Sequence, residues 1–317
     1  MDDKIFRSRA QRTTPESCPI HNGAPSADPL HATPRATGST TAAQGVVDVA
    51  HALGVDLMPW QRRVLDTALE LDDDGRLSWR NVVVSTPRQQ GKSTLLMALV
   101  LWRLLSMSDQ TILFGAQNRM AARARLIDGW WPRLQRSEFA DRLTISRGAG
   151  FEAIRCDNGS ILRLLSSEES SGHGESVDLA VVDECWSLES HVEQAIRPAT
   201  LARPEPQLWF ASTAGTARST WWLGKLEAGR RAIVEQSDNL AHFEWSAPLD
   251  ADPADPETWR ACMPALGATV SEDAVRADFE VLPIAEFVRG YLNRTTDGLD
   301  AGWRVVPSDV WSAAKWV

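Results

Sequence analysis

Thr86-Pro87-Arg88-Gln89-Gln90-Gly91-Lys92-Ser93 separates a β-branched run, 82–84, from an apolar stretch of helical character, 94–105. A strand, a tight loop and a helix in this order predict a phosphate-binding loop, because the backbone N–H groups at the helix N-terminus point at a bound anion. Within it, Lys92 is expected to reach the β- and γ-phosphates and Ser93 to ligate Mg²⁺. Thr86 replaces the glycine that usually opens such a loop, so the first half of the pattern is degenerate.

A second motif follows an apolar strand predicted over 177–182, which ends at Asp183-Glu184. A phosphate-binding-loop ATPase needs a carboxylate at the end of a neighbouring parallel strand to hold the Mg²⁺ shell, and Asp183 suits that role. It also needs a base for the attacking water, which suits Glu184. An Asp-Glu pair is common on protein surfaces, but together with the loop it indicates an ATPase that uses ATP and Mg²⁺.

Composition limits the other classes. The chain has 317 residues, 43% apolar residues and a formal net charge of −9, so a protein coated in basic surface is excluded. Its four cysteines form no C-x-x-C pair, and neither a disulfide framework nor a zinc site follows from them. The sequence shows no secretory signal and no apolar stretch long enough to span a bilayer, so we expect a soluble intracellular protein.

Hydrophobic patterning predicts the fold class. Strands over 111–116 and 207–211 alternate with helices over 43–53, 59–71 and 117–134, and Asp157-Asn158-Gly159 predicts a hairpin between two further strands. We expect an α/β P-loop NTPase with a mostly parallel central sheet flanked by helices, plus a helical, loop-rich C-terminal segment. The expected units are a disordered N-terminal arm (1–42), the ATPase core (43–245) and a helical lid or linker (246–317).

The order of these motifs resembles that of the large terminase subunit of tailed bacteriophages. Pro59-Trp60-Gln61 is similar to its adenine-recognising glutamine motif, and its phosphate loop also lacks the first glycine and carries an arginine, as at Arg88. The strand ending at Asp183-Glu184 is similar to its second nucleotide motif. Ser212-Thr213-Ala214 is similar to its coupling motif, and 286–293 is similar to a segment near the end of its ATPase region.

The resemblance implies an ATP-hydrolysing motor that drives double-stranded DNA into a viral procapsid. It implies that Glu184, Lys92 and Arg88 act in catalysis, with Ser93 and Asp183 on Mg²⁺. The expected nucleotide contacts are Gln61, Thr86, Pro87, Arg88, Gln89, Gln90, Gly91, Lys92, Ser93, Thr94 and Asp183. Three alternatives stay open at single residues: Gln61 as an ordinary helix-start residue, Arg88 as a surface ion-pair partner, and the polar residues 212–213 as simple caps of a strand end rather than coupling residues.

Partners and location follow from the same resemblance. It implies double-stranded DNA, a portal protein, a small terminase subunit and assembly into a homo-oligomeric ring, with no membrane, in the host cytoplasm and transiently at the portal vertex. A ring motor also implies a trans-acting arginine finger, for which Arg197, Arg203 and Arg218 are candidates. Free DNA binding is expected to be weak, with candidate contacts on one predicted helix at residues 119, 123 and 125, for which a solvated helix face is the favoured alternative.

Large terminase subunits usually continue into a nuclease domain, which needs on the order of 150 further residues. The residues after Glu184 are too few for it once the coupling strand and the helical segment are placed, so we expect a separate or missing nuclease domain and no nuclease activity in this chain. Two other functions stay open: a helicase-like DNA-dependent ATPase, and a non-hydrolysing packaging scaffold with the same fold.

Overall fold

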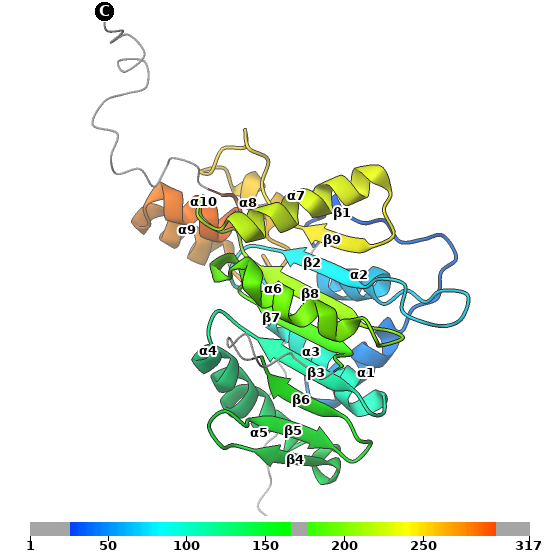
Figure 1. Ribbon diagram of the computed structural model, residues 1–317. Coiled ribbons are helices and arrows are strands. Elements are labelled where there is room, and N and C mark those ends of the chain that lie inside the picture. Colours follow the sequence, from blue (N-terminus) through cyan, green and yellow to red (C-terminus); the bar gives the residue numbers. More distant parts are fainter. Residues whose placement is uncertain (1–25, 166–175, 296–317) are drawn as a thin grey trace, which may run out of the picture.

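The structure is a computed structural model that describes residues 26–165 and 176–295. Its centre is a nine-stranded sheet in the order β1-β9-β2-β8-β7-β3-β6-β5-β4 (Figure 1). The central run from β9 to β6 is parallel, and β1, β5 and β4 pair antiparallel at the two edges. The strands are β1 (His31–Ala32), β2 (Asn81–Ser85), β3 (Thr111–Gly115), β4 (Leu143–Ser146), β5 (Ala153–Cys156), β6 (Ile161–Leu164), β7 (Leu179–Asp183), β8 (Gln207–Ser212) and β9 (Leu240–Glu244).

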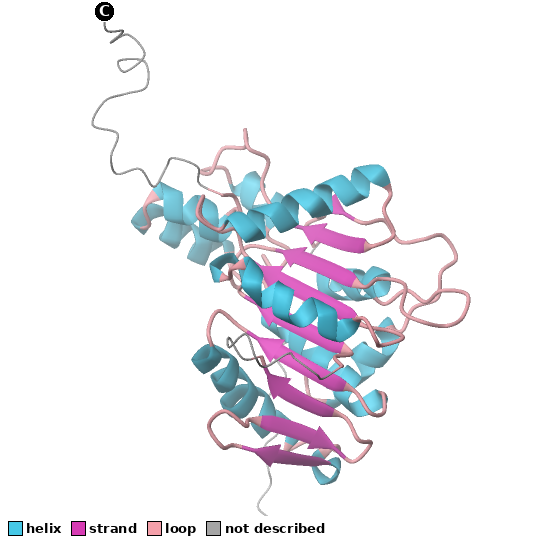
Figure 2. Cartoon of the chain, in the orientation of Figure 1, coloured by secondary structure: helices cyan, strands magenta, loops and turns pink. Residues whose placement is uncertain are grey.

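Helices cover both faces of the sheet, as Figure 2 shows. One face carries α1 (Ala43–Ala52), α2 (Pro59–Ala68), α3 (Lys92–Ser106), α4 (Arg119–Arg123), the π-helical η1 (Ala124–Trp130) and α5 (Trp131–Leu134). The other carries α6 (Ser190–Ile196) and α7 (Thr220–Glu235). Short 3₁₀ turns are η2 (Ala140–Arg142), η3 (Cys185–Ser187) and η4 (Arg197–Thr200). No helix within the described ranges is long and apolar enough to cross a bilayer.

Burial on both faces explains the continuous apolar runs of the central strands. In β2, Val82 and Val84 pack into the core under α1 to α5, whereas Val83 packs into the core under α6 and α7. All three valines are at most 1% exposed. A parallel sheet covered on two sides needs apolar residues at every position, so the prediction of a mostly parallel, helix-flanked sheet is confirmed.

The C-terminal part of the described chain forms a smaller core beside the carboxyl ends of the strands. It consists of α8 (Pro256–Cys262), α9 (Glu272–Val281) and α10 (Ile284–Tyr291), packed around Trp259, Val275 and Phe287. The backbone of this segment contacts the loop after β2, because the Arg88 N–H donates to the Gly290 carbonyl at 2.8 Å. Figure 1 shows these helices next to the tips of β2 and β8.

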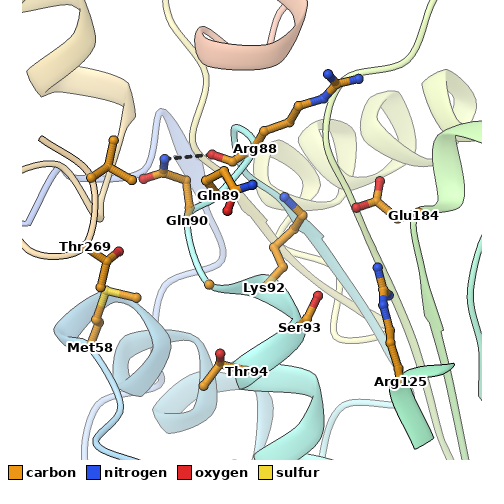
Figure 3. A pocket seen from close by; sticks show the side chains of 12 residues that line it. Met58, Arg88, Gln89, Gln90, Lys92, Ser93, Thr94, Arg125, Glu184 and Thr269 are labelled. Carbon is orange, nitrogen blue, oxygen red and sulfur yellow. Dashed lines mark hydrogen bonds between the residues drawn. The ribbon is translucent and has the colours of Figure 1, made fainter. Parts of the chain in front are cut away.

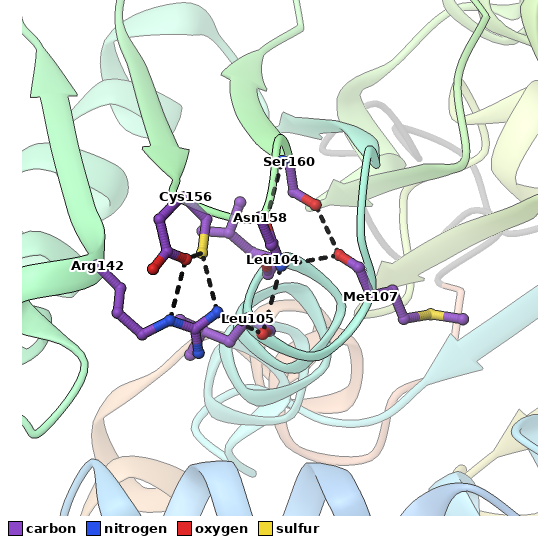
Figure 4. A network of polar contacts seen from close by, with 8 residues as sticks. Leu104, Leu105, Met107, Arg142, Cys156, Asn158 and Ser160 are labelled. Carbon is purple, nitrogen blue, oxygen red and sulfur yellow. Dashed lines mark hydrogen bonds and ion pairs between the residues drawn. The ribbon is translucent and has the colours of Figure 1, made fainter.

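The predicted Asn-Gly hairpin is present between β5 and β6, and its turn also caps a helix (Figure 4). Asn158 Nδ2 donates to the carbonyls of Leu104 at 3.1 Å and Met107 at 3.0 Å, and Ser160 Oγ donates to the latter at 2.6 Å. The last carbonyls of α3 have no partner within their own helix. The turn therefore fixes the edge of the sheet to the end of α3.

Several element predictions need correction. The helix predicted over 59–71 ends at Ala68, where the chain turns into short bridges, and the helix predicted over 117–134 is divided by the π-helical η1. Strands β4 and β9 were not predicted at all. In β9 the polar side chains of His242 and Glu244 suggest an exposed loop, but both are 0% exposed because they bond to each other and to Arg230.

The expectation of disorder over 1–42 can be compared with the structure only over 26–42, since residues 1–25 lie outside the described residues. In this described part of the N-terminal arm, β1 pairs with β9 and Thr33 N donates to the His242 carbonyl at 2.8 Å. The Trp245 indole also donates to the Ala27 carbonyl at 2.8 Å. Residues 26–42 are therefore packed against the sheet, because they satisfy the backbone groups of the edge strand β9.

Candidate active site

The loop between β2 and α3 approaches its neighbours so closely that one position requires glycine. Gly91 has a φ of 93°, in the left-handed region. A Cβ there would lie 2.7 Å from Met58 Cε and 2.9 Å from Gln61 Nε2. Any larger residue would be strained and would also push these side chains away. The glycine lets the first turn of α3 begin directly at the loop, so that its free N–H groups face outward.

Lys92 is the first residue of α3, and its side chain turns back along the loop. Its Nζ donates to the carbonyls of Thr86 at 3.1 Å and Pro87 at 2.9 Å. The residue is 6% exposed. Burial lowers the pKa of Lys92, although the nearby carboxylates of Glu184 and Asp183 oppose that shift. The loop thus holds a poorly hydrated cation, which favours an anionic ligand.

Asp183 ends β7 and connects three parts of the site. Its Oδ2 accepts a hydrogen bond from Ser93 Oγ at 2.9 Å and is ion-paired with the Arg125 guanidinium. Its Oδ1 accepts the Glu184 N–H at 2.9 Å. The carboxylate is 1% exposed, so its charge is compensated only by these groups and by nearby Lys92. The predicted metal ligands Ser93 and Asp183 are therefore adjacent.

Glu184 follows in an uncommon backbone conformation. Its φ of 60° and ψ of 45° lie in the left-handed region, which non-glycine residues adopt rarely and mostly at functional sites. The turn aims the carboxylate into the space beside Lys92, and the Trp186 indole donates to Glu184 Oε2 at 3.0 Å. Trp186 is in turn fixed at its backbone N–H by Ser212 Oγ at 3.0 Å. The side chain is thus oriented by a bonded partner.

These groups line one cavity of about 580 Å³. In Figure 3 the side chains of Lys92, Ser93, Arg125 and Glu184 point into the same space. Three cations and one free carboxylate surround it, next to the N-terminus of α3. Its lining is Met58, Arg88, Gln89, Gln90, Gly91, Lys92, Ser93, Thr94, Arg125, Glu184, Thr269 and Val270. The cations of this cavity suit a polyanionic ligand, and the carboxylate is placed to accept a proton from a group beside that ligand.

The remaining loop residues divide between the cavity and its support. Arg88, Gln89 and Thr94 line the cavity, whereas Thr86 is fully buried beneath it. Arg88 is exposed, and its side chain has no hydrogen bond or ion pair to the residues that the structure describes. The alternative interpretation of Arg88, a surface ion pair, therefore has no acidic partner among those residues. Gln90 is fully buried and accepts the Ala265 N–H at 2.8 Å, which joins the loop to the C-terminal core.

Gln61 lies outside the cavity. It is 0% exposed, its Oε1 accepts the Met58 N–H at 2.8 Å, and its Nε2 donates to the Gly91 carbonyl at 2.8 Å. The neighbouring Trp60 indole donates to the Gln90 carbonyl at 3.1 Å. The Pro-Trp-Gln motif thus supports the loop from below, and Gln61 is not among the residues that line the cavity.

The segment Ser212-Thr213-Ala214 connects the loop with the rest of the molecule. The Ser212 carbonyl accepts the Thr86 N–H at 3.2 Å, while its hydroxyl orients Trp186 as described above. Ala214 N–H donates to Asn293 Oδ1 at 2.5 Å, and Asn293 Nδ2 donates to Ser85 Oγ at 2.8 Å. These bonds make a continuous path from Trp186, the partner of Glu184, to the loop and on to Asn293, just after α10. Thr213 is 2% exposed beside them.

The arginines considered for DNA contact have other partners. Arg119 is ion-paired with Glu152 at 2.7 Å and Arg123 with the same carboxylate at 3.3 Å. Arg125 points into the cavity and is paired with Asp183. The three side chains do not form one unpaired basic face, because Glu152, in the loop before β5, pairs with Arg119 and Arg123, and Asp183, at the end of β7, pairs with Arg125. DNA contact by these residues stays a prediction.

The three arginine-finger candidates have different surroundings. Arg197 is ion-paired with Glu193, and Arg203 with Asp178 at 3.4 Å. Arg218 is exposed, and its side chain forms no hydrogen bond or ion pair with residues 26–165 or 176–295. Arg218 is therefore the candidate with the freest guanidinium in the described chain.

Sequence analysis missed three functional side chains. Arg125 lies far from both motifs in sequence, and no local pattern links it to Asp183. Trp186 follows the Asp-Glu pair, but only the left-handed turn at Glu184 directs its indole back to that carboxylate. Asn293 ends the segment 286–293, which had been noted for its resemblance, so a signal existed for it without a role.

Fold and site together define a P-loop NTPase architecture. No protein-family model and no curated protein matches the sequence. Among solved structures, the fold is similar to that of the large terminase of bacteriophage HK97, with a TM-score of 0.68 and 21% identity over 81% of this chain. It is also similar to the ATPase domain of the large terminase of Thermus phage P74-26, with a TM-score of 0.53 and 15% identity over 78% of this chain.

The extent of these matches differs between the two structures. This chain covers 97% of the Thermus phage ATPase domain but 56% of the HK97 large terminase, about half the length of that protein. The chain therefore has the fold of a large-terminase ATPase domain.

Proposed function

We propose that this protein is the ATP-hydrolysing motor subunit that drives double-stranded DNA into a viral procapsid. The observation that carries the proposal is the convergence of Lys92, the Ser93–Asp183 pair and the oriented carboxylate of Glu184 on one cavity. A phosphate anchor, a metal-ligand pair and a base are the three parts that hydrolysis of a nucleoside triphosphate requires. The similarity to terminase ATPase domains supports DNA packaging as the process.

In this proposal the α3 N-terminus and Lys92 bind the phosphates of ATP. Lys92 Nζ is held by neutral oxygens of the loop, the carbonyls of Pro87 at 2.9 Å and Thr86 at 3.1 Å and the Thr86 hydroxyl at 3.3 Å, so it can exchange them for phosphate oxygens with a small movement. Its buried charge is better compensated by an anion than by neutral carbonyls. Arg88, whose guanidinium lies at the rim of the same cavity without a partner in residues 26–165 or 176–295, contacts the γ-phosphate.

The residues present fit a Mg²⁺ ion. Ser93 and Asp183 would hold it with their hydroxyl and carboxylate oxygens, which lie 2.9 Å apart. Mg²⁺ takes oxygen ligands, usually only one or two from protein, and completes its shell with phosphates and water. When bound, the ion neutralises negative charge on the phosphates.

Glu184 acts as the base that orients and deprotonates water. The indole of Trp186 fixes one carboxylate oxygen and leaves Oε1 directed at the cavity. Movement is transmitted through Ser212, whose backbone bonds the loop while its hydroxyl bonds Trp186. We infer that Ser212, Thr213 and Ala214 pass a change at the phosphates on to Asn293 and the C-terminal helices.

The partners of the motor follow from the proposed process. They are double-stranded DNA, a portal protein, a small terminase subunit and further copies of this chain in a ring. Arg218 is the arginine that we propose as a trans-acting finger, since its guanidinium is exposed and has no partner in the described chain. The protein acts in the host cytoplasm and at the portal vertex of the procapsid.

ATP hydrolysis by the purified protein tests the proposal. We expect Mg²⁺-dependent turnover, loss of nucleotide binding in Lys92→Ala, and retained binding with about 10²- to 10⁴-fold slower hydrolysis in Glu184→Gln. Lys225→Ala and Glu189→Gln are matched controls, because the first residue pairs with Glu193 and the second is exposed, both outside the cavity. Unchanged turnover in Glu184→Gln would remove the base from the mechanism.

A further inference from the structure

Arg125 and Ser93 contact the same oxygen of Asp183. The guanidinium pairs with Oδ2, and the serine hydroxyl lies 2.9 Å from that atom. The other oxygen, Oδ1, already accepts the Glu184 N–H. The Asp183 side chain is 1% exposed and that of Arg125 is 27% exposed. The arginine therefore reaches from the solvent side into the oxygen pair assigned above to a divalent metal.

An arginine and a divalent cation cannot occupy this position together. Mg²⁺ demands near-octahedral ligands at about 2.0–2.1 Å, which leaves no room for a guanidinium nitrogen between the two oxygens. Two positive groups at one carboxylate oxygen also repel each other strongly where little water screens them. Asp183 Oδ2 can therefore contact either the Arg125 guanidinium or a divalent metal, but not both at once.

We propose that Arg125 is a positioning residue that exchanges with the divalent metal on Asp183. The proposal rests on the function proposed above, since it takes Ser93 and Asp183 as the metal ligands. With Arg125 on Asp183 the buried carboxylate is neutralised and the site is held together; with metal on Asp183 the guanidinium is released into the cavity. There Glu184 and the oxygens of a bound phosphate are its available partners.

The position of Arg125 in its helix connects this exchange to a larger segment. Arg125 belongs to the π-helical η1, which interrupts α4 and α5. π-helical turns are rare and occur often at functional sites, where their looser register allows a local shift. The segment η1 is continuous with α4, which packs on β3 and β6, so a register shift around Arg125 reaches the helix that covers this side of the sheet. Metal occupancy is thereby transmitted to the outer part of the sheet.

Binding of Mn²⁺ alone to the full chain, without nucleotide, tests the exchange. Mn²⁺ is a paramagnetic substitute for Mg²⁺, and its free concentration is measured by electron paramagnetic resonance. We expect Arg125→Gln to bind Mn²⁺ about ten- to a hundredfold more tightly than the wild type, because a charge-assisted bond no longer competes for the carboxylate. Arg123→Gln is the matched control on the same helical segment, paired with Glu152 outside the cavity, and should bind as the wild type does.

Two further variants keep the test decisive. The double variant Arg125→Gln/Asp183→Asn should lose the tighter Mn²⁺ binding, because it lacks the Asp183 carboxylate for which arginine and metal compete. Arg125→Lys keeps a cation to neutralise Asp183, so it should fold even if the glutamine variant does not. Its Mn²⁺ affinity should lie between those of the wild type and Arg125→Gln. Equal Mn²⁺ affinity in the wild type and in the folded Arg125 variants overturns the exchange.

A separate measurement distinguishes failure of the exchange from failure of the proposed function. Binding of a fluorescent ATP analogue in EDTA depends on Lys92 and not on metal. Retained analogue binding that is lost in Lys92→Ala, together with equal Mn²⁺ affinities, removes the role of Arg125 alone. Analogue binding that is unaffected by Lys92→Ala removes the proposed function as well.

Discussion

At the scale of single residues, Gln61 has a clear structural role. Its amide oxygen and nitrogen bond to the backbone of Met58 and Gly91, and the side chain is completely buried. Both bonds fix the distance between the start of α2 and the glycine at which α3 begins. The side chain therefore sets the shape of the phosphate loop, whichever base the nucleotide carries.

Replacing Gln61 by leucine tests this role. Gln61→Leu leaves the Met58 N–H and the Gly91 carbonyl without their partner, at a cost of about 1–3 kcal/mol for each buried group left unsatisfied. We expect lower stability and weaker binding of ATP and GTP by the same factor, measured by thermal unfolding and by competition with a fluorescent analogue. A selective loss of ATP over GTP would instead support direct recognition of adenine.

Most of the site was predictable where its residues are close in sequence. The phosphate loop and the Asp183-Glu184 pair carry their chemistry within short segments, and the structure places both at one cavity. The position of Gln61 was not predictable, because only the packing of α2 under the loop removes it from the cavity. The contact of Arg125 was not predictable for a similar reason: its partner Asp183 is distant in sequence and meets it only in the folded sheet.

At the scale of elements, β9 and α7 are joined by a buried polar cluster. Glu244 accepts two hydrogen bonds from the Arg230 guanidinium, at 2.8 and 2.6 Å, and further bonds from Ser246 and His242. Burial alone would raise the pKa of Glu244, but the bonds from His242 and Arg230 outweigh it and hold the pKa well below the usual 4.5. The ionised carboxylate thus stabilises the fold.

The pH dependence of unfolding tests this cluster. Because the folded pKa is depressed, the stabilisation by Glu244 is complete above about pH 4.5 and is lost as the pH falls through the folded value. Glu244→Gln should therefore lower the free energy of unfolding by about 3 kcal/mol at pH 7. The difference from the wild type should shrink on acidification.

Denaturant unfolding across pH 3–8 provides the measurement for this cluster. Glu257→Gln serves as the control, because its carboxylate is 75% exposed in a surface pair and should change almost nothing. A difference between the wild type and Glu244→Gln that stays constant with pH would contradict the electrostatic explanation.

The same cluster explains why the elements after residue 220 were only partly predictable. Central strands such as β2 and β7 are apolar throughout and could be recognised from composition. In β9 the alternating polar residues belong to a buried ion pair whose partner, Arg230, lies on α7. A local pattern cannot distinguish a paired buried charge from an exposed one, so β9 was not predicted.

At the scale of the whole molecule, the charge distribution limits the DNA contacts that the proposed motor offers. The net charge is −9, and Arg119 and Arg123 are occupied by Glu152. Non-specific affinity for DNA depends on many simultaneous phosphate contacts. A single copy therefore offers few of them, whereas a ring multiplies weak contacts around one duplex.

DNA binding by the isolated chain should accordingly be weak and salt-sensitive. Fluorescence anisotropy of a labelled duplex across a salt series is the measurement. The double variant Arg119→Gln/Arg123→Gln should lower thermal stability, because Glu152 is left buried and unpaired, and should leave the DNA affinity nearly unchanged. Nanomolar binding that persists at high salt would refute this view of the monomer.

The pairing of β2 has a consequence for folding during synthesis on the ribosome. This strand leads into the phosphate loop, yet both of its neighbours, β8 and β9, are synthesised far later in the chain. Until residue 244 has emerged, Val82, Val83 and Val84 have at least one open edge on which another nascent chain can add a strand. The loop is thus synthesised early, but the strand that leads into it is fully paired only after β9 has been made. A chain that binds nucleotide has therefore finished folding its whole parallel sheet.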